Sequence, residues 1–424
     1  MHFFDYKGRS FYAEGVPVER IVKEIGTPVY IYSQKTLKRH FRAYDEAFSG
    51  APHLICYSIK ANSNLSVLKT FSEEGSGFDI VSGGELFRAL KVGAYPGKIV
   101  FSGVGKRADE IEYALKSGIL MFNVESPEEL RAIDKIAGRL RKKAGIAIRV
   151  NPDVDPKTHP YISTGLKKNK FGIETAEAFK EYLYAKRKLG NVNPIGIDCH
   201  IGSQITQIGP FVDALKKTTG LLKMLRAEGV EIKYLDMGGG LGITYDKETP
   251  PHPSRYGEAV LKGTKGLGLT LIFEPGRSMV GNAGILATTV VYTKKGTKKN
   301  FIIVDAAMND LARPSLYGSY HAIKAVKKNG KREITADVVG PICESGDFLA
   351  KDREVPAVKA GESLAVMSAG AYGFSMSSNY NTRPRAAEVM VSGREFFVVR
   401  KREGLNDLLA GEELIVKKKA ARRR

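Results

Sequence analysis

The sequence predicts an α/β protein that combines a (β/α)8 TIM barrel with a second, mostly-β domain. Eight short β-branched apolar runs alternate with helical stretches over residues 53–273, which suits a barrel of about 250 residues. After about residue 280 the strand-like runs continue without comparable helices between them, as in a mostly-β domain. A doubly wound open sheet shares the alternation. Eight repeats and the absence of a GxGxxG motif after the first strand favour the barrel.

Strands of the barrel are expected where apolar residues recur at every second position, and helices where they recur at every third or fourth position. Strands are predicted at 53–59, 78–81, 98–102, 120–124, 145–150, 194–200, 232–237 and 269–273. Helices are predicted at 62–74, 84–93, 107–117, 126–142, 174–189 and 209–229. Leu65, Leu68 and Phe71 show the helical spacing in the first of these helices.

The second domain is expected to draw on both ends of the chain. Its predicted strands are 287–292, 301–304, 334–339, 363–367, 387–391 and 395–399. The first 25 or so residues are too few to fold alone and are expected to add a strand or two to it. We therefore divide the chain into an N-terminal segment at 1–30 that joins the β domain, a (β/α)8 barrel at 31–280, a β domain at 281–414 and a basic tail at 415–424.

The charge of the chain is strongly basic. It has 424 residues, with 66 Lys and Arg against 46 Asp and Glu, a net charge of +20. A basic chain favours contact with nucleic acid, but no zinc-finger spacing or aromatic-basic RNA-binding motif accompanies the charge. A lysine-rich solvated surface with a frayed basic tail is the favoured interpretation, and nucleic acid is not an expected partner.

Other features of the composition point to a cytoplasmic protein. No apolar run approaches the ~18 residues that would span a bilayer, and the N-terminus lacks the pattern of a signal peptide. Cys56, Cys199 and Cys343 are sparse and form no CxxC pair, so neither a disulfide framework nor a zinc site is indicated. We expect a reducing compartment, no membrane association and no metal.

Unusual residues follow four of the predicted strands. Strands 1, 6, 7 and 8 end in YSIKAN (57–62), HIGSQ (200–204), MGGGLG (237–242) and EPGR (274–277), and catalytic groups of such barrels lie at strand C-termini. Lys60 directly follows an apolar strand, so its stem should be buried and its amine held at the barrel mouth. Burial is expected to lower the pKa of this amine, which could then form a Schiff base with an aldehyde.

The other strand ends supply a candidate anion site, one carboxylate and one flat imidazole ring. Gly238, Gly239 and Gly240 could hold a phosphate with backbone N–H groups, although a glycine triplet can also be a simple turn. Arg277 adds a second anion-binding group. Glu274 could hold a proton on a heterocyclic nitrogen or only pair with a barrel lysine, and His200 could stack on an aromatic ring or be a core histidine. Together with a Schiff-base lysine these are the requirements of pyridoxal 5'-phosphate.

At these residues the sequence resembles the diaminopimelate decarboxylases, barrel-type (alanine-racemase-like) pyridoxal-phosphate enzymes that convert meso-2,6-diaminopimelate to L-lysine and CO2 in the last step of lysine biosynthesis. The resemblance covers essentially the whole chain up to the basic tail. Its motifs are TPVYIYS (27–33), YSIKAN, FDIVSGGEL (78–86), HPYISTGLKKNKFGI (159–173), HIGSQ, DMGGGLG, EPGR, GPICESGD (340–347) and AYGFSMSSNYNTRPR (371–385).

The resemblance implies roles for the cofactor-binding residues. Lys60 would carry the cofactor, His200 would stack on its ring, and Glu274 would pair with the protonated ring nitrogen. Asp79 would be a cofactor-facing or supporting group. The phosphate would be held by Ser203, Gly239, Gly240 and the backbone of Pro275, Gly276 and Arg277.

The resemblance also implies a substrate site that two subunits share. Arg277 and Arg313 would bind carboxylate, because a guanidinium can bind it in two places. The other substrate contacts would be Tyr317, Glu344 and Tyr372, and Tyr372 would also touch the cofactor. Cys343 would donate the proton to Cα after CO2 leaves. Its segment would reach the partner subunit's site, so a homodimer is expected.

Parts of the sequence are also compatible with other functions. An ornithine- or arginine-type decarboxylase of the same fold is the nearest, but those substrates lack the second carboxylate that Arg313 and Tyr317 suit. A carboxynorspermidine-type decarboxylase is more distant. A nucleic-acid-binding protein with a vestigial barrel would explain the charge and predicts salt-dependent affinity, but it leaves the strand-end motifs unexplained.

Overall fold

Eight parallel strands close into a barrel in this computed structural model, which describes residues 2–155 and 170–415. Around the ring they are β5 (His53–Ser58), β6 (Gly77–Ile80), β7 (Ile99–Phe101), β8 (Met121–Val124), β9 (Ala144–Asn151), β11 (Val192–Asp198), β12 (Tyr234–Asp236) and β13 (Thr270–Phe273). β13 pairs with β5 and β8 pairs with β9, so the ring is complete. The barrel prediction is confirmed, and each strand end lies within two residues of its expected position.

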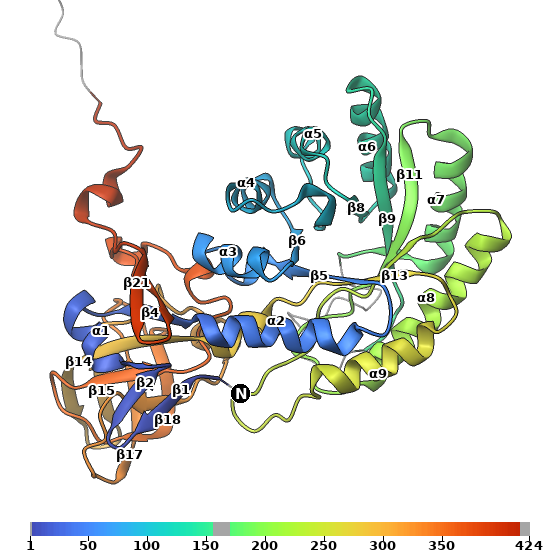
Figure 1. Ribbon diagram of the computed structural model, residues 1–424. Coiled ribbons are helices and arrows are strands. Elements are labelled where there is room, and N and C mark those ends of the chain that lie inside the picture. Colours follow the sequence, from blue (N-terminus) through green and yellow to red (C-terminus); the bar gives the residue numbers. More distant parts are fainter. Residues whose placement is uncertain (1, 156–169, 416–424) are drawn as a thin grey trace, which may run out of the picture.

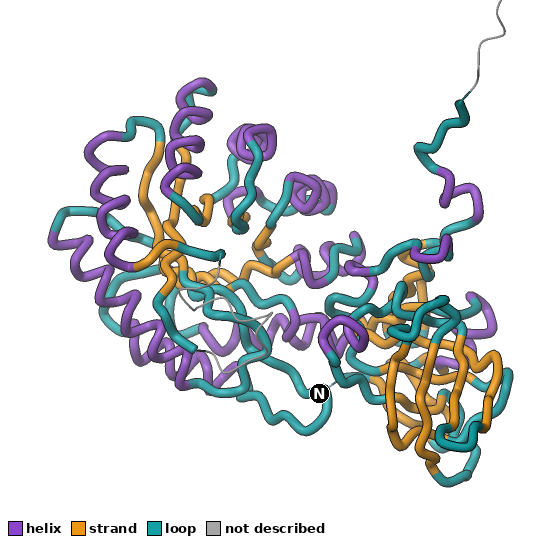
Figure 2. The backbone as a smooth tube through the Cα atoms, turned by 180° about the vertical axis from the view of Figure 1, so that it is seen from behind, coloured by secondary structure: helices purple, strands orange, loops and turns teal. Residues whose placement is uncertain are grey.

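Helices surround the barrel (Figures 1 and 2). They are α2 (Gln34–Phe48), α3 (Leu65–Glu73), α4 (Gly83–Lys91), α5 (Ala108–Ser117), α6 (Pro127–Arg139), α7 (Thr175–Lys188), α8 (Gly209–Ala227) and α9 (Pro253–Thr264). Side chains of Ser33, Asn64, Ser82 and Ser126 cap α2, α3, α4 and α6, and such caps satisfy N–H groups that the first turn leaves open. β10 (Ile173–Glu174) adds a short pairing to β9.

The β domain is a mixed sheet beside the barrel (Figure 1). Its order is β18 (Phe348–Pro356), β17 (Glu333–Val339), β15 (Asn300–Val304), β14 (Gly284–Lys295), β4 (Val29–Ser33), β20 (Ala387–Ser392) and β21 (Glu395–Arg400), and β19 (Ser363–Val366) joins β14 to β16 (Ile323–Ala325). Sequence patterns missed β4, β16 and β18. β16 has three residues, and the charged run 351–354 masks the apolar alternation of β18.

The N-terminal strands join the β domain, as expected, and do so through a small sheet that packs on it. β1 (Phe4–Lys7), β2 (Ser10–Ala13) and β3 (Val16–Pro17) form a three-stranded sheet of their own, followed by α1 (Val18–Ile25). Phe4 and Phe11 are buried in one core with residues of β4 and β14, so this sheet packs on the β domain instead of extending it. β4 pairs with β14 and β20 and crosses the boundary placed at 30. The boundaries themselves stay predictions.

Two parts of the sequence analysis fall outside the described residues. They are the greater part of the motif at 159–173 and the basic tail from 416 onward. Within the described part, no helix is both long and apolar enough to cross a membrane.

Candidate active site

Each barrel strand contributes one buried polar side chain at its C-terminal end. These residues are Ser58, Asp79, Ser102, Asn123, Arg149, Asp198, Asp236 and Glu274, and each is at most 5% exposed. We call this set the polar layer. Two residues earlier on β5, β7, β8, β9 and β13 are Cys56, Val100, Met121, Ala147 and Ile272, which pack together. Because side chains alternate across a strand with a period of two, a polar layer rests directly on an apolar one.

Lys60 lies at the edge of the polar layer, in the single turn at Ile59–Ala61 that follows β5. Its Nζ is 2.7 Å from Asp79 Oδ2, and the same oxygen accepts a 2.6 Å hydrogen bond from Ser58 Oγ. Burial alone would lower the pKa of Lys60, but the charges of Asp79 and Glu274 outweigh burial and raise the pKa above its usual value. The expectation of a lowered pKa is therefore wrong for the free amine, because the motif does not show the opposing carboxylates.

Glu274 follows β13 and makes no ion pair within the described part of the chain. Its Oε1 accepts hydrogen bonds from Ser102 Oγ at 3.1 Å and from Asn123 Nδ2 at 3.0 Å. Burial, followed by the nearby charges of Asp236 and Asp79, raises the pKa of Glu274 well above its usual value. Its carboxyl group thus lies among neutral donors and other acids, not in the lysine salt bridge that was the alternative.

A cavity of about 200 Å³ opens above the polar layer. Eleven residues expected at the site line it: Lys60, His200, Ser203, Gly239, Gly240, Glu274, Gly276, Arg277, Arg313, Tyr317 and Tyr372. Four different barrel strands and the β domain contribute to this wall. The fold therefore brings together groups that are more than 300 residues apart in the chain.

The glycine loop after β12 packs so closely on neighbouring backbone that two of its positions accommodate no Cβ. A Cβ on Gly239 would come within 2.4 Å of the Glu274 carbonyl oxygen, and one on Gly240, where φ is +119°, within 2.7 Å of the Gly202 carbonyl oxygen. The Gly239 N–H donates to His200 Nδ1 at 3.2 Å. Burial and then the charge of Arg149 lower the pKa of His200 well below its usual value, so the imidazole is neutral and flat beside the cavity.

Comparisons with known proteins agree with this geometry. Residues 34–281 match the model of the pyridoxal-dependent decarboxylases, pyridoxal binding domain. Diaminopimelate decarboxylases from Pseudomonas aeruginosa and Vibrio cholerae are 53% and 52% identical, and each alignment covers 98% of this chain and 100% of the relative. The chain belongs to the diaminopimelate decarboxylase family. A solved family structure from Helicobacter pylori, complexed with L-lysine, superposes with a TM-score of 0.89 at 47% identity over 92% of this chain and 98% of that one.

The site of this diaminopimelate decarboxylase family member fits pyridoxal phosphate. Asp79 Oδ1 is buried without a hydrogen-bond partner among the described residues, so an acceptor is available beside Lys60. Gly239 and Gly240 line the cavity, and a Cβ on either residue would collide with a backbone oxygen, so only glycine fits there. An amine, a neutral imidazole and a buried carboxyl group line the same cavity, and these are the donors and acceptors that this cofactor requires.

The outer part of the cavity carries two buried guanidinium groups. Arg277 donates to Ser203 Oγ at 3.2 Å and to Tyr245 Oη at 2.8 Å. Arg313 lies over the ring of Tyr245 at 5.2 Å and donates to Ser319 Oγ at 3.1 Å. Neither arginine meets a carboxylate within the described residues, and Arg313 Nε has no partner there. Burial and the neighbouring Arg277 lower the pKa of Arg313, as expected for a cation that lacks its anion.

Four predicted site residues are not part of the cavity wall. Asp79 lies beneath it, where it holds Lys60, and the Pro275 carbonyl oxygen accepts from Ser58 N at 3.2 Å. Cys343 and Glu344 are exposed on the loop before β18. In the single chain, these last two residues are therefore not brought to the cavity.

Sequence patterns did not reveal most of the polar layer, nor Tyr245, the tyrosine that both arginines contact. Asn123, Arg149, Asp198 and Asp236 are single polar residues near the ends of apolar strands. That position was a usable signal, because a lone buried polar residue in an apolar strand needs a partner. Tyr245 lies in a loop after β12 and gave no comparable signal.

Proposed function

We propose that this protein decarboxylates meso-2,6-diaminopimelate to L-lysine with pyridoxal 5'-phosphate carried on Lys60. The observation that carries the proposal is the pair of buried arginines, Arg277 and Arg313, that have no carboxylate partner in the described chain. Diaminopimelate brings a second carboxylate to the far end of the cavity, whereas ornithine and arginine bring only cations. A guanidinium suits such a carboxylate because its planar fork can bind both oxygens.

The chain's own residues divide the work of the reaction. The bound cofactor supplies a ring that accepts the electron pair left when CO2 departs. Lys60 would hold the cofactor, and Asp79, 2.7 Å from the Lys60 Nζ, would hold the lysine ammonium whenever the cofactor is not attached to it. Glu274 keeps a proton at the ring nitrogen, which makes the ring a stronger electron acceptor. The arginines orient the substrate so that the bond to CO2 is the one that breaks.

We further propose that two copies of the chain share each active site. Cys343 and Glu344 are held in place although they are exposed. The Cys343 N–H donates to Asn381 Oδ1 at 2.8 Å, and Tyr380 Oη donates to Glu344 Oε2 at 2.9 Å. An ordered, exposed thiol and carboxylate suit a loop that reaches a partner's cavity, where Cys343 would return the proton to Cα and Glu344 would bind the distal ammonium.

The substrate assay tests the main proposal. The purified protein is incubated with pyridoxal phosphate and meso-diaminopimelate, L-ornithine or L-arginine, and each reaction is assayed for the corresponding decarboxylated product. We expect L-lysine from diaminopimelate alone. Turnover of ornithine or arginine instead would contradict the substrate assignment and keep the cofactor. In the same assay, Lys60→Ala should lose turnover and the borohydride-trappable attachment of the cofactor.

A mixing experiment tests the shared site. Cys343→Ala should lower turnover and leave cofactor binding unchanged, and Lys60→Ala should be inactive. When the two variants are unfolded and refolded together, a hybrid dimer has one site with both residues intact, so part of the activity should return. Absence of recovery, with dimers present in sedimentation, would contradict a site shared between subunits.

We also propose a cytoplasmic location, which suits the free thiols of Cys56 and Cys199.

A further inference from the structure

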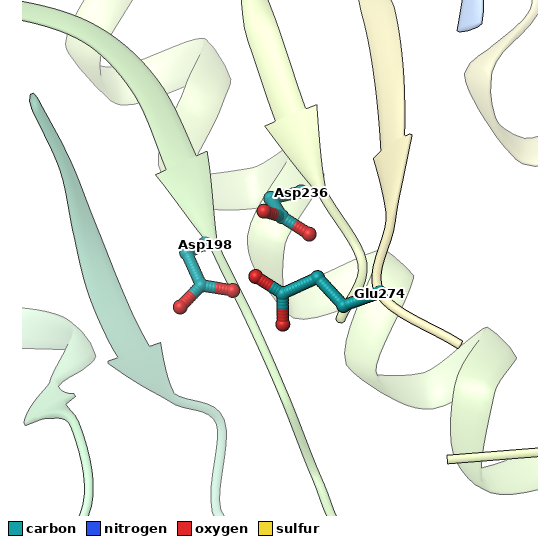
Figure 3. A group of neighbouring side chains, drawn as sticks. All are labelled: Asp198, Asp236 and Glu274. Atoms are coloured by element: carbon teal, nitrogen blue, oxygen red, sulfur yellow. The ribbon is translucent and has the colours of Figure 1, made fainter. Parts of the chain in front are cut away.

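Two groups of like charge lie close together at the outer end of the cavity, and no carboxylate among the described residues pairs with them. Arg277 and Arg313 are 5% and 6% exposed, so both charges are largely removed from water. Acids of the site lie at the inner end, where oxygens of Asp198, Asp236 and Glu274 are within 4.8 Å of one another (Figure 3). A buried charge is costly unless other groups compensate it. The compensation for the two arginines must therefore come from neutral groups.

Tyr245 connects the two guanidinium groups. Its Oη accepts a hydrogen bond from Arg277 Nη1 at 2.8 Å, and the Cζ of Arg313 lies 5.2 Å from the centre of its ring. A hydroxyl oxygen and a ring face are both electron-rich, so each attracts a cation without carrying a formal charge. Tyr372 adds a second ring, 4.9 Å from the Cζ of Arg277 and 6.0 Å from that of Arg313. Neutral groups thus hold the two like charges close together.

Tyr245 lies behind the arginines and not in the wall of the cavity. Arg277 and Arg313 line the cavity, whereas Tyr245 is not among the described residues that line it. Tyr245 is buried, with 8% of its surface exposed. It differs in this respect from Tyr317 and Tyr372, which do line the cavity. Any effect of Tyr245 on a bound ligand must therefore pass through the arginines.

Tyr245 is itself held in place by the β domain and by its own loop. The ring of His321 meets the Tyr245 ring edge-on, with the ring centres 5.2 Å apart and the planes at 76°. His321 Nδ1 donates to the Met367 carbonyl oxygen at 2.8 Å, because a carbonyl oxygen can only accept. Burial, followed by the charge of Arg313, lowers the pKa of His321 to about 3, so this ring is neutral and adds no third cation. On the other side, the Tyr245 N–H donates to Glu248 Oε2 at 3.0 Å.

We propose that Tyr245 gives the cavity its preference for a ligand with a distal carboxylate, by holding Arg277 and Arg313 in the arrangement that binds this carboxylate. Two unconnected guanidinium groups would have to be brought together against their repulsion when the ligand arrives. In the folded protein Tyr245 already holds them together, so less of the binding free energy is lost in ordering them. Tyr245 is a positioning residue in this scheme, because it acts through the two arginines.

Two ligands that differ only in the carboxylate test this inference, which rests on the proposed function because that function assigns the arginines to the second carboxylate. L-Lysine, the expected product, keeps this carboxylate, and 1,5-diaminopentane is the same molecule without it. Each is bound to the protein loaded with pyridoxal phosphate, at one pH and one ionic strength, and calorimetry gives the dissociation constants. The ratio of the two constants measures the carboxylate preference. A change that merely loosens the site weakens the binding of both ligands and leaves the ratio unchanged.

We expect Tyr245→Leu to lower the affinity for L-lysine by about tenfold to a hundredfold and to leave that for 1,5-diaminopentane within about twofold of wild type, since a hydrogen bond to a charged group is lost only where the carboxylate binds. Tyr245→Phe keeps the ring beside Arg313 and loses only the hydroxyl group that binds Arg277, so its loss should be smaller. With meso-diaminopimelate as substrate, both variants should raise KM more than they lower kcat.

Tyr182→Phe is the matched control for Tyr245→Phe. Tyr182 is also buried, and its hydroxyl group donates to the Gly196 carbonyl oxygen at 2.6 Å, but it is not among the described residues that line the cavity and contacts neither arginine. Removal of this hydroxyl group therefore reproduces the loss of a buried hydrogen bond away from the site. Both dissociation constants of Tyr182→Phe should equal those of wild type.

An unchanged ratio in Tyr245→Leu, while wild type prefers L-lysine, would overturn the inference and leave the proposed substrate standing. An equal loss of affinity for both ligands would overturn it as well, because the role of Tyr245 would then be structural only. Should Tyr245→Leu fail to fold, Tyr245→Phe serves in the same comparison. Equal binding of the two ligands by wild type would instead contradict the assignment of the arginines to a carboxylate, and the inference would fall with that part of the proposed function.

Discussion

At the scale of single residues, the ammonium group of Lys60 is held by the carboxylate of Asp79. Asp79 is fully buried and accepts from both Lys60 and Ser58. This arrangement keeps the free lysine charged, and only the neutral amine attacks an aldehyde. Asp79 therefore stabilises the released lysine and slows its reattachment.

Asp79→Asn should speed the attachment of pyridoxal phosphate to the cofactor-free protein at neutral pH. Removal of the carboxylate lowers the pKa of Lys60, so a larger fraction of the amine is neutral at a given pH, about tenfold for each unit of change. The attachment rate should rise with pH in both proteins, with the midpoint at lower pH in the variant. Rapid-mixing absorbance measures the rate, and Asp310→Asn is the control, because Asp310 is also a buried carboxyl group but lies outside the polar layer. Superimposable pH profiles would contradict this role for Asp79.

At the scale of elements, the loop between β12 and α9 takes a path beside the cavity that two of its glycines make possible. Gly239 lies against the Glu274 carbonyl group, and Gly240 has a φ of +119°, a conformation that residues with a Cβ rarely adopt. The loop also fixes His200 through the Gly239 N–H. One short segment thus lines the cavity and orients the His200 ring beside it.

Gly239→Ala should weaken cofactor binding by about tenfold to a hundredfold. The new Cβ would come within 2.4 Å of a backbone oxygen, and such overpacking usually costs about 1–3 kcal/mol. Equilibrium titration with pyridoxal phosphate gives the affinity. Gly209→Ala is the control, because nothing lies within 4 Å of its added Cβ. An unchanged affinity for Gly239→Ala would mean that the loop moves freely and does not shape the cofactor site.

At the scale of the whole molecule, a buried glutamate joins the barrel to the β domain. Glu388 on β20 accepts from Tyr32 Oη on β4 at 2.7 Å and from Asn64 Nδ2 of the barrel at 3.0 Å, and it pairs with Arg400 on β21. Asn64 begins α3 directly after the segment that carries Lys60. The position of the lysine segment therefore depends on the second domain.

Glu388→Ala should destabilise the protein by about 3–5 kcal/mol, because it removes the buried carboxylate that Arg400, Tyr32 and Asn64 share. Thermal or urea unfolding measures the loss. Glu395→Ala is the control, since Glu395 lies on β21 of the same domain but is exposed, and its effect should stay within about 0.5 kcal/mol. A small effect of Glu388→Ala would show that water replaces the lost carboxylate and that the domains are held together elsewhere.

Local patterns in the sequence were sufficient for the barrel and for part of the cavity lining. The resemblance to the family, and not a local pattern, supplied Ser203, Arg313, Tyr317 and Tyr372. Periods of two and of 3.6 are properties of short segments, so the strands and most helices could be located without tertiary information. The motifs that end β5, β11, β12 and β13 marked Lys60, His200, Gly239 and Glu274, because strand C-termini of a barrel meet at one face. The short strand β16 and the charged strand β18 were missed because their patterns are too brief or are masked by exposure.

Only the tertiary structure decided the electrostatics of the site. The pKa of Lys60 depends on Asp79 and Glu274, and the pKa of Glu274 is raised by its burial and by the charges of Asp236 and Asp79 on other strands. These groups are 19 to 214 positions from Lys60 in the chain, and their interaction falls off with distance in space rather than in sequence. The sequence by itself determined which side chains are present at the barrel mouth, and the fold determined which of them are charged.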